Sequence, residues 1–314
     1  MEYINLKNSS LSVSRLCIGG DPFGGHGWGK VSQDDVAQAV NTAIDVGINF
    51  FDTADVYGLG ESERILGRTI ATRRQSVVLA TKFGVRRSND NTRTFYDNSP
   101  KWIRTALSGS LKRFNTDYID LYQLHYRDGI TSIETIVETL DALKQEGLIR
   151  YYGLSNIYKK DIIDIIPYRD KFISFQDEYS LANRRNEDDI VRISNELKIS
   201  PMTWGSLGQG ILTGKYGRDV VFDAGDRRSR ETYNNFHGDK LQHNIDIVDK
   251  MSRIAARNKQ KLSAIAIRYI LDFIKDSIVI VGVKTKDQVL SNLEAFGWSL
   301  TQKEIDELEV VSRE

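Results

Sequence analysis

Short apolar segments alternate with longer amphipathic segments along nearly the whole chain, and this alternation limits the folds that are possible. The apolar segments have the length of buried strands, and the segments between them carry apolar residues at helical spacing. Strands are expected near residues 16–18, 48–52, 77–81, 118–124, 150–154, 172–175, 200–204 and 277–281. Eight strands with intervening helices predict an α/β fold, specifically a (β/α)8 TIM barrel.

The expected helices complete this pattern, and two further elements flank it. Ser32 and the three residues after it resemble a capping box, which predicts a first helix there. The other helices are expected near residues 60–72, 99–114, 133–146, 159–166, 187–198, 241–258, 262–274 and 286–295. Residues 4–6 and 11–13 predict an N-terminal β-hairpin, and apolar residues at helical spacing after Gly297 predict an extra C-terminal helix.

No Pro- or Ser-rich linker and no shift of composition divides the chain, so we predict one domain over residues 1–314. One segment breaks the alternation. Residues 214–240 are long, charged and glycine-containing. An insertion of this kind is usually a functional loop or a disordered one.

The charge balance and the cysteine content narrow the function. The 314 residues include 43 Lys and Arg against 43 Asp and Glu, which gives no support for a nucleic-acid or anionic membrane partner. The single cysteine, Cys17, excludes an internal disulfide and a multi-cysteine metal site and fits a reducing compartment. The chain shows neither a signal peptide nor a run of membrane-spanning length, so we expect a soluble, cytoplasmic protein without a metal.

Reactive side chains stand at the ends of several expected strands. Asp52 ends one strand, Tyr57 follows it in the next turn, and Lys82 and His125 each follow a later strand. In a parallel barrel the carboxyl ends of all strands meet on the face where chemistry occurs. We therefore expect these four side chains to converge there.

The four residue types suit proton donation to an oxygen on which charge develops. A tyrosine has a pKa of about 10 and is a poor donor at neutral pH. A nearby lysine favours the phenolate, so Lys82 is expected to lower the pKa of Tyr57, with Asp52 holding the ammonium charged. His125 would orient a substrate carbonyl or share the proton.

Each residue also has an ordinary structural interpretation. A strand-end Asp is more often a helix cap, a Lys at a barrel mouth is often a surface charge, and a His after an apolar strand is usually packed. The presence of all four at strand ends favours the functional interpretation.

Several longer segments resemble the signature segments of the aldo-keto reductase family. They include residues 51–58, 80–84, 124–125, 110–121 and 149–156, and the resemblance covers essentially the whole chain. It is nearest to the bacterial branch that contains the inositol-operon reductase of bacilli. The segment shared with that branch is Tyr96-Asp97-Asn98-Ser99-Pro100.

The resemblance implies an NADP-dependent oxidoreductase that reduces an aldehyde or ketone, sugar-like or polyol-derived, with NADPH as hydride donor and NADH as an alternative. Tyr57 would be the general acid, Lys82 and Asp52 would tune it, and His125 would orient the carbonyl. Ser155, Asn156 and Gln176 match the residues that hold the carboxamide. Trp204 matches the aromatic residue that stacks on the nicotinamide, although a large aromatic side chain can also fill a barrel core.

The remaining cofactor residues combine this resemblance with an anion site that can be recognised physically. Residues 281–288 form a strand, a glycine turn and a helix start, which favours anion binding, and Lys284 could pair with a 2′-phosphate. Arg228 and Lys215 would hold the cofactor's phosphates under a lid formed by residues 214–240, unless the arginines there are only a solvated charge run. The other expected cofactor residues are Gly20, Asp21, Gly205, Ser206, Leu207, Gln209, Gly210, Gly282, Val283, Gln288 and Asn292.

The chain departs from the family pattern near the expected substrate. Gly205-Ser206 replaces Ser-Pro or Phe-Pro, Asp21-Pro22 replaces an aromatic residue or threonine, and Tyr126-Arg127 follows His125 in place of the commoner pairs. Together, Asp21 and Arg127 suggest a polyhydroxylated or anionic substrate. The expected substrate-binding residues are Phe23, Trp28, Tyr126 and Arg127.

Two other functions stay open from the sequence. Lys82 could form a Schiff base in a lyase, although a paired Asp52 would keep the amine charged. The protein could instead bind the cofactor as a sensor with little turnover, like the related potassium-channel β-subunits. A two-domain dinucleotide enzyme is disfavoured because no G-x-G-x-x-G fingerprint follows a first strand. A monomer and a homo-oligomer are both compatible with the sequence.

Overall fold

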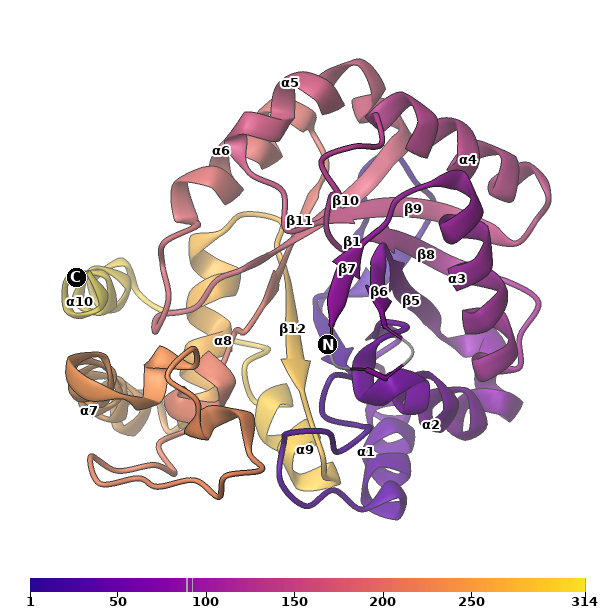
Figure 1. Cartoon of the computed structure of the whole chain (residues 1–314). Coiled ribbons are helices and arrows are strands. Elements are labelled where there is room, and N and C mark those ends of the chain that lie inside the picture. The colour runs from indigo at the N-terminus through magenta and orange to yellow at the C-terminus, as the bar shows by residue number, and fades with distance from the viewer. Residues whose placement is uncertain (89, 92, 314) are drawn as a thin grey trace.

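The computed structural model describes residues 1–313 apart from 89 and 92, and its centre is a closed barrel of eight parallel strands (Figure 1). The strands follow one another around the barrel in chain order, so each pairs with its neighbours in the sequence of strands. They are β3 (Leu16–Gly19), β4 (Phe50–Asp52), β5 (Val78–Phe83), β8 (Ile119–Leu124), β9 (Ile149–Ser155), β10 (Phe172–Glu178), β11 (Ser200–Trp204) and β12 (Ile278–Gly282). The predicted (β/α)8 barrel is confirmed.

A ring of helices covers the outside of the barrel and buries the main apolar core against the strands. Helix α1 begins after Ser32, whose side chain accepts a hydrogen bond from Asp35 N at 3.2 Å, as the capping sequence predicts. The helices are α1 (Gln33–Asp45), α2 (Glu61–Ile70), α3 (Pro100–Phe114), α4 (Ile133–Gln145), α5 (Ile162–Ile165), α6 (Glu187–Leu197), α7 (Gly238–Asn258), α8 (Leu262–Phe273), α9 (Lys286–Leu293) and α10 (Gln302–Ser312).

The predicted N-terminal hairpin, β1 (Tyr3–Asn5) and β2 (Ser12–Ser14), packs against the amino-terminal end of the barrel. Its Leu6 and Leu11 join a second apolar cluster that fills the barrel interior with Phe50 and Met202. The turn of the hairpin is fixed to the barrel because Lys7 N donates to Ser200 Oγ at 2.9 Å. The hairpin therefore closes this end, which leaves the opposite end for a site.

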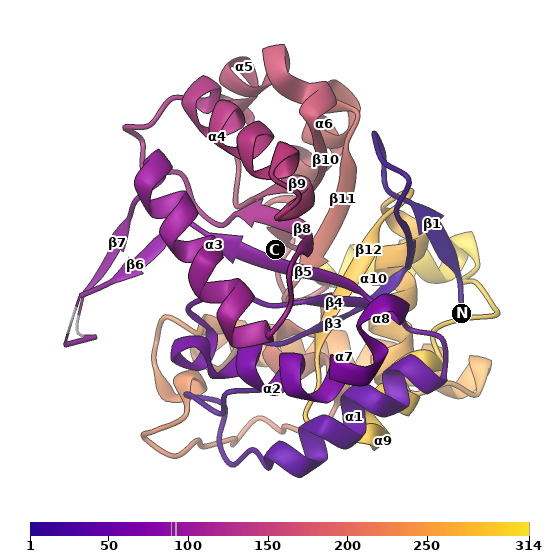
Figure 2. The same ribbon diagram turned by 90° about the vertical axis from the view of Figure 1, so that its right-hand side faces the viewer.

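A second hairpin was not expected from the sequence. Strands β6 (Val85–Arg87) and β7 (Thr94–Tyr96) pair antiparallel directly after β5 and project from the body on the side opposite to β1 (Figure 2). Most of their side chains are exposed. Without a buried face, such short strands leave no alternation of apolar and polar residues that a sequence pattern could detect.

Residues 214–240 are ordered by their own small core. They contain the 3₁₀-helices η6 (Arg227–Ser229) and η7 (Asn234–Phe236), and α7 starts at Gly238 rather than near residue 241. Phe236 packs edge-on against Tyr216 and Phe222 with ring centroids 5.5 and 5.0 Å apart. Of the two alternatives left open by the sequence, the structure shows a folded loop.

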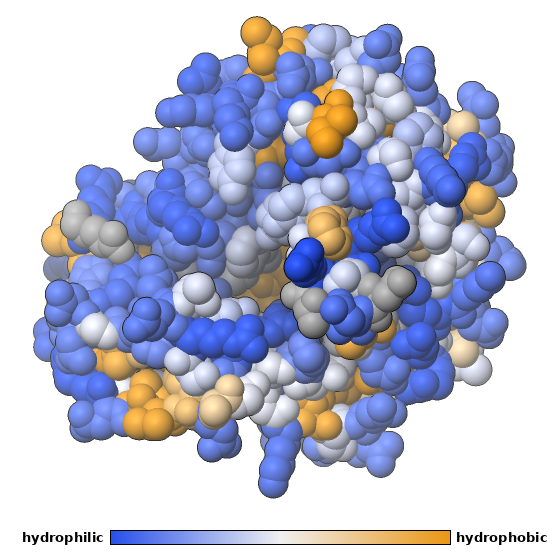
Figure 3. Space-filling model, viewed as in Figure 1, coloured by the Kyte–Doolittle hydropathy of each residue, from blue (hydrophilic) through white to orange (hydrophobic). Residues whose placement is uncertain are grey.

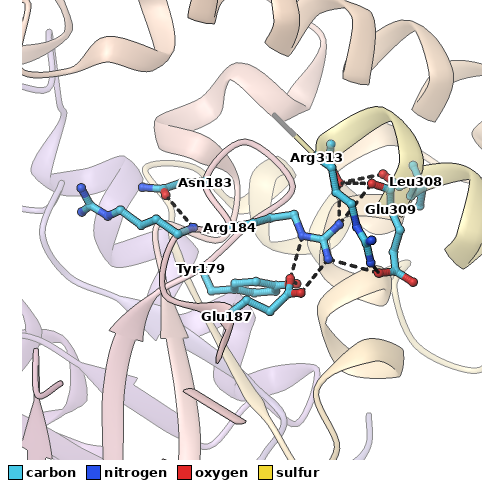
Figure 4. Close-up of polar contacts among 9 residues, drawn as sticks. Tyr179, Asn183, Arg184, Glu187, Leu308, Glu309 and Arg313 are labelled. Carbon is cyan, nitrogen blue, oxygen red and sulfur yellow. Dashed lines mark hydrogen bonds and ion pairs between the residues drawn. The ribbon is translucent and has the colours of Figure 1, made fainter. Parts of the chain in front are cut away.

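The predicted C-terminal helix α10 is fastened to the barrel through Arg184 (Figure 4). The Arg184 guanidinium donates to Glu187 Oε2 at 2.6 Å and to Glu309 Oε1 at 3.2 Å, so it joins the loop before α6 to α10. Tyr179, at the end of β10, donates to the same Glu187 oxygen at 2.6 Å. These contacts tie the loop after β10 to α10.

The visible surface is mainly hydrophilic, with apolar side chains in small scattered patches (Figure 3). In the part of the chain that the structure describes, no helix is both long and apolar enough to cross a membrane. The same residues contain no group of three or more His, Cys, Asp or Glu side chains arranged to hold a metal ion.

Candidate active site

A buried carboxylate forms the centre of the polar site at the open end of the barrel. Asp52 is the last residue of β4 and is 3% exposed. Its Oδ2 accepts a hydrogen bond from Lys82 Nζ at 2.5 Å, and its Oδ1 accepts from Gln123 Nε2 at 2.9 Å and Gln176 Nε2 at 2.5 Å. A buried charge is tolerated when it is paired and its oxygens are hydrogen-bonded, and both conditions hold here.

Lys82 is equally buried and has no surface role. It lies in β5, the neighbour of β4, and its ammonium also donates to the carbonyl oxygen of Thr53 at 2.9 Å. The solvent-exposed lysine considered from the sequence is excluded. A Schiff-base lysine needs a neutral amine, whereas this one lies against a carboxylate, so the geometry also disfavours the lyase alternative.

Tyr57 lies directly beside this ion pair. It opens the 3₁₀-helix η1 (Tyr57–Gly60), and Lys82 Nζ lies 5.1 Å from the centre of its ring. Burial raises the pKa of the Tyr57 phenol well above its usual value, and the carboxylates of Asp21 and Asp52 raise the pKa further. The expected lowering of this pKa is therefore not found, because burial dominates.

His125 follows β8 and meets Tyr57 edge-on, with ring centroids 5.8 Å apart. Burial lowers the pKa of His125 well below its usual value, and the charge of Lys82 lowers it further. The imidazole is therefore neutral near pH 7. Its Nδ1 has no hydrogen-bond partner among the described residues, and the ring stacks on Tyr126 at 4.9 Å.

Gln123 is a member of this network that sequence reasoning missed. It lies in β8, fully buried, and its Oε1 accepts from Gln176 Nε2 at 2.8 Å while its own amide donates to Asp52. The available signal was a polar residue inside the apolar segment 119–124. Gln123 is a positioning residue, because it acts on Asp52 rather than on the reacting atoms.

A cavity of about 680 Å³ opens beside Tyr57 and Asp52, a size typical of ligand sites. All the expected cofactor residues except Ser155, Asn156 and Val283 line it. Trp28, an expected substrate residue, lines it as well. Further lining residues that were not expected are Gly19, Pro22, Thr213, Tyr233, Lys261, Leu262, Ser263, Ile280, Val281, Asp287 and Ser291.

The three exceptions lie behind the cavity wall. Val283 is fully buried in the core. Asn156 Nδ2 donates to the carbonyl oxygen of His125 and to Ser155 Oγ, both at 3.0 Å. Asn156 and Ser155 therefore fix the backbone at His125, and Val283 supports the turn before α9.

Three expected substrate residues do not line this cavity, and one of them, Tyr126, stacks on His125 instead. Phe23 is 1% exposed and belongs to the apolar core. Arg127 donates to Asp161 Oδ1 and Asp164 Oδ2, both at 2.9 Å, so its charge is already paired. Their assignment to substrate is corrected, and Arg127 does not support an anionic substrate.

One end of the cavity is strongly basic. Lys284, Arg228 and Lys215 all line it, and burial together with the charges of the other two lowers the pKa of Lys284. Helix α9 begins there, with Thr285 as its N-cap accepting from Gln288 N at 3.4 Å. Three crowded cations at a helix N-terminus suit a phosphate, because an anion relieves their repulsion.

Trp204 and the loop after it form another wall. Trp204 ends β11 and is only partly buried, so it faces the cavity rather than the closed barrel core. Gly205 follows with φ of 68°, a backbone conformation that favours glycine. A flat indole beside a glycine turn suits stacking of a planar ring. The residues present thus fit a nicotinamide dinucleotide at both ends.

The loop of residues 214–240 closes over this cavity by contacts with the loop after β3. Arg227 lies 3.4 Å from Asp21 Oδ2, and Trp28 Nε1 donates to the same oxygen at 2.8 Å. Lys284 Nζ donates to the carbonyl oxygen of Trp28. Asp21 thus bridges the two loops, and Trp28 joins the loop after β3 to the turn before α9.

A buried carboxyl at the end of β10 gives the first testable prediction. Burial raises the pKa of Asp177 to about 7, and its Oδ2 has no partner among the described residues. The folded protein therefore binds this proton more tightly than the unfolded chain. The protonated Asp177 carboxyl therefore stabilises the folded protein fully at low pH, and this stabilisation is lost as the pH rises through about 7. Asp177→Asn should raise the free energy of unfolding by about 2–4 kcal/mol at pH 8, with little gain at pH 4.

Urea denaturation at both pH values measures this difference. Asp188→Asn, on an exposed carboxylate of α6, is the matched control. An Asp177→Asn gain that did not change with pH would contradict the assignment of a raised pKa.

Comparison with known proteins agrees with this geometry. The family model described as the aldo/keto reductase family matches residues 15–313. The chain is 30% identical to aldo-keto reductase YhdN of Bacillus subtilis over 99% of this chain and 93% of that one. It is 31% identical to aldo-keto reductase yakc [NADP(+)] of Schizosaccharomyces pombe, over 95% and 91% of the two chains.

A solved structure is similar over nearly the same length. The glycerol dehydrogenase of Gluconobacter oxydans superposes with a TM-score of 0.88 at 30% identity, covering 98% of this chain and 94% of that one. The family match covers the catalytic candidates Asp52, Tyr57, Lys82 and His125 and the cavity beside them. The chain therefore belongs to the aldo/keto reductase family and is an NAD(P)H-dependent oxidoreductase.

Proposed function

We propose that this protein reduces an aldehyde or ketone to the alcohol with NADPH, and that Tyr57 donates the proton. The observation that carries the proposal is one cavity that is lined by Tyr57, by Asp52, which is paired with Lys82, and by three cations. The bound cofactor supplies a hydride to the carbonyl carbon. The protein must supply the proton and hold the carbonyl in place.

The raised pKa of Tyr57 suits this role before the reaction, because the phenol stays protonated until charge develops on the substrate oxygen. Neutral His125 lies edge-on beside Tyr57, and its imidazole would hydrogen-bond that oxygen. Lys82, 5.1 Å from the Tyr57 ring, would stabilise the phenolate that proton transfer leaves, and Asp52 would hold Lys82 there.

The cofactor would extend from Trp204 to Lys284. Trp204 would stack on the nicotinamide, and Gln176 at the cavity floor would contact its carboxamide. Ser155 and Asn156 would act from behind the wall by holding His125. The phosphates would lie with Arg228 and Lys215 under the loop of residues 214–240, and Gln288 and Asn292 would contact the adenosine.

Preference for NADP over NAD would come from Lys284. Replacing it by methionine should raise the KM for NADPH about 10- to 100-fold, the cost of one charge-assisted hydrogen bond. The KM for NADH should change little. Steady-state kinetics with each cofactor measure both values, and an equal loss for NADPH and NADH would contradict the pairing of Lys284 with the 2′-phosphate.

The branch of the family, the number of domains, the location and the oligomeric state are also proposals. Residues 96–100 support placement near the inositol-operon reductase branch, which would suit a sugar-like or polyol-derived carbonyl. The uninterrupted chain supports one domain over residues 1–314. The low cysteine content supports a cytoplasmic location, and both a monomer and a homo-oligomer fit.

The test is incubation of the purified protein with NADPH and then NADH against a panel of aldehydes and aldoses. Substrate-dependent loss of reduced-cofactor absorbance is the expected result. Tight cofactor binding without turnover on any member would favour the sensor alternative instead. Binding of neither cofactor would contradict both.

A further inference from the structure

A second cavity, of about 390 Å³, meets the active site at Tyr57 and is lined mainly by basic side chains. Its lining residues are His26, Val56, Tyr57, Arg87, Arg227, Arg230 and Tyr233. No carboxylate lines it among the described residues. It shares Tyr57 and Tyr233 with the larger cavity, so a molecule in it would reach the proton donor.

The three arginines come from separate parts of the chain. Arg87 ends β6 in the projecting hairpin, and Arg227 and Arg230 belong to the loop of residues 214–240. Arg87 and Arg230 are exposed, and within the described residues neither side chain has a hydrogen bond or an ion pair. Each could therefore bind an anion without breaking an existing contact.

Arg227 is held in place on the wall of this cavity. Its guanidinium lies 3.4 Å from Asp21 Oδ2 and 5.6 Å from the Trp28 ring, and its backbone N donates to Gly27 O at 2.9 Å. Gly27 has φ of 76°, and a Cβ there would lie 2.4 Å from Arg227 Cγ. Only glycine therefore lets the loop after β3 approach so closely.

The neighbouring arginines of η6 serve different cavities. Arg228 lines the large cavity, where its Nη2 donates to Asp226 Oδ2 at 2.6 Å, whereas Arg227 lines the small one. The Trp28 ring lies within 6 Å of both guanidinium groups, 5.6 Å from Arg227 and 5.8 Å from Arg228. The second basic group is thus separate from the one that suits the cofactor's phosphates.

We propose that this cavity binds an anionic group, a phosphate or a carboxylate, at the non-reacting end of the substrate. The inference rests on the proposed function, because it places the carbonyl at Tyr57. Three arginines opposed by the single carboxylate of Asp21 leave about two positive charges, which matches a phosphate monoester of charge about −1.5 to −2 at pH 7. Arginine is also the side chain best shaped to bind phosphate and carboxylate by paired hydrogen bonds.

Matched substrate pairs test the proposal. Glyceraldehyde 3-phosphate is compared with glyceraldehyde, and succinic semialdehyde with butanal, by kcat/KM with NADPH. Each anionic member should exceed its neutral partner by about tenfold or more, since a charge-assisted hydrogen bond is worth about 1.5–3 kcal/mol. The gain should be larger for the phosphate pair and should shrink at high salt.

Substitutions then locate the effect. Arg230→Met and Arg87→Met should each lower the ratio of anionic to neutral kcat/KM about tenfold or more. Arg230→Lys should keep part of the ratio, and Arg230→Glu should invert it. Arg253→Met, at an exposed arginine of α7 that lines neither cavity, should leave the ratio as it is.

The outcomes separate this proposal from the proposed function. Reduction of both members of each pair with equal kcat/KM would overturn the anion site while leaving a carbonyl reductase. A weaker Kd for NADPH in Arg230→Met, with an unchanged substrate ratio, would also overturn it, because the cavity would then serve the cofactor. If the protein reduced none of these carbonyl compounds, the proposed function itself would be contradicted.

Discussion

Replacing Tyr57 by phenylalanine should lower kcat for carbonyl reduction about 10²–10⁴-fold, the usual contribution of a positioned general acid. The phenyl ring can keep its edge-on contact with His125 and its place near Lys82, so the fold and the cofactor cavity should be preserved. The loss should therefore appear in kcat, while the Kd for NADPH stays within about twofold of the unmodified protein.

Stopped-flow mixing of enzyme–NADPH with an aldehyde measures the step directly, and quenching of protein fluorescence gives the Kd. Tyr118→Phe is the matched control, since this tyrosine donates to Gln75 Oε1 and lines neither cavity. A Tyr57→Phe protein that retained more than a tenth of the rate would contradict the assignment of Tyr57 as proton donor.

Breaking the buried ion pair should have the second large effect. Asp52→Asn keeps an oxygen for the amides of Gln123 and Gln176 but leaves the ammonium of Lys82 buried without its carboxylate. Removing one partner of a buried pair costs about 3–5 kcal/mol, so the free energy of unfolding should fall by that amount. Catalysis should fall as well, because Lys82 is no longer held charged beside Tyr57.

The double variant Asp52→Asn, Lys82→Met separates the two effects. It removes both charges, so most of the lost stability should return, since buried pairs replaced together are often neutral in cost. Activity should stay low, because no cation remains to stabilise the phenolate. Urea denaturation and kcat are measured on the single and double variants. A double variant as unstable as Asp52→Asn would show that packing at position 52, and not the unpaired charge, causes the loss.

The barrel could be predicted from the sequence because its signals are local. A buried parallel strand and an amphipathic helix each leave a periodic pattern within a dozen or so residues. The meeting of Asp52 and Lys82 could also be predicted, since parallel strands place their carboxyl ends on one face. Hairpin β6–β7 carries no such pattern and was missed.

The features that were missed or predicted wrongly depend on residues far away in the chain. Arg127 reaches Asp161 and Asp164, which are 34 and 37 residues later, and no pattern around Arg127 reveals them. Gln123 bonds Asp52 across 71 residues. The direction of the Tyr57 pKa shift depends on burial, which is a property of the assembled barrel.

The smaller, basic cavity also could not be predicted from the sequence. The arginines near residue 228 could be noticed as a charge run, but their division between two cavities could not. Arg87 and Arg230 are brought together only by the hairpin after β5 and the folded loop before α7. A substrate site of this kind becomes visible only when the loops are placed in space.

Hydride transfer from NADPH to the carbonyl carbon can be followed directly with an isotope. The protein is incubated with NADPH carrying deuterium at the transferred position of the nicotinamide and with an aldehyde that it reduces, and the alcohol is analysed by mass spectrometry and NMR. The expected product carries one deuterium on the carbinol carbon, and its formation should be almost abolished in Tyr57→Phe. An alcohol without deuterium, or bound cofactor that is never oxidised, would contradict this transfer.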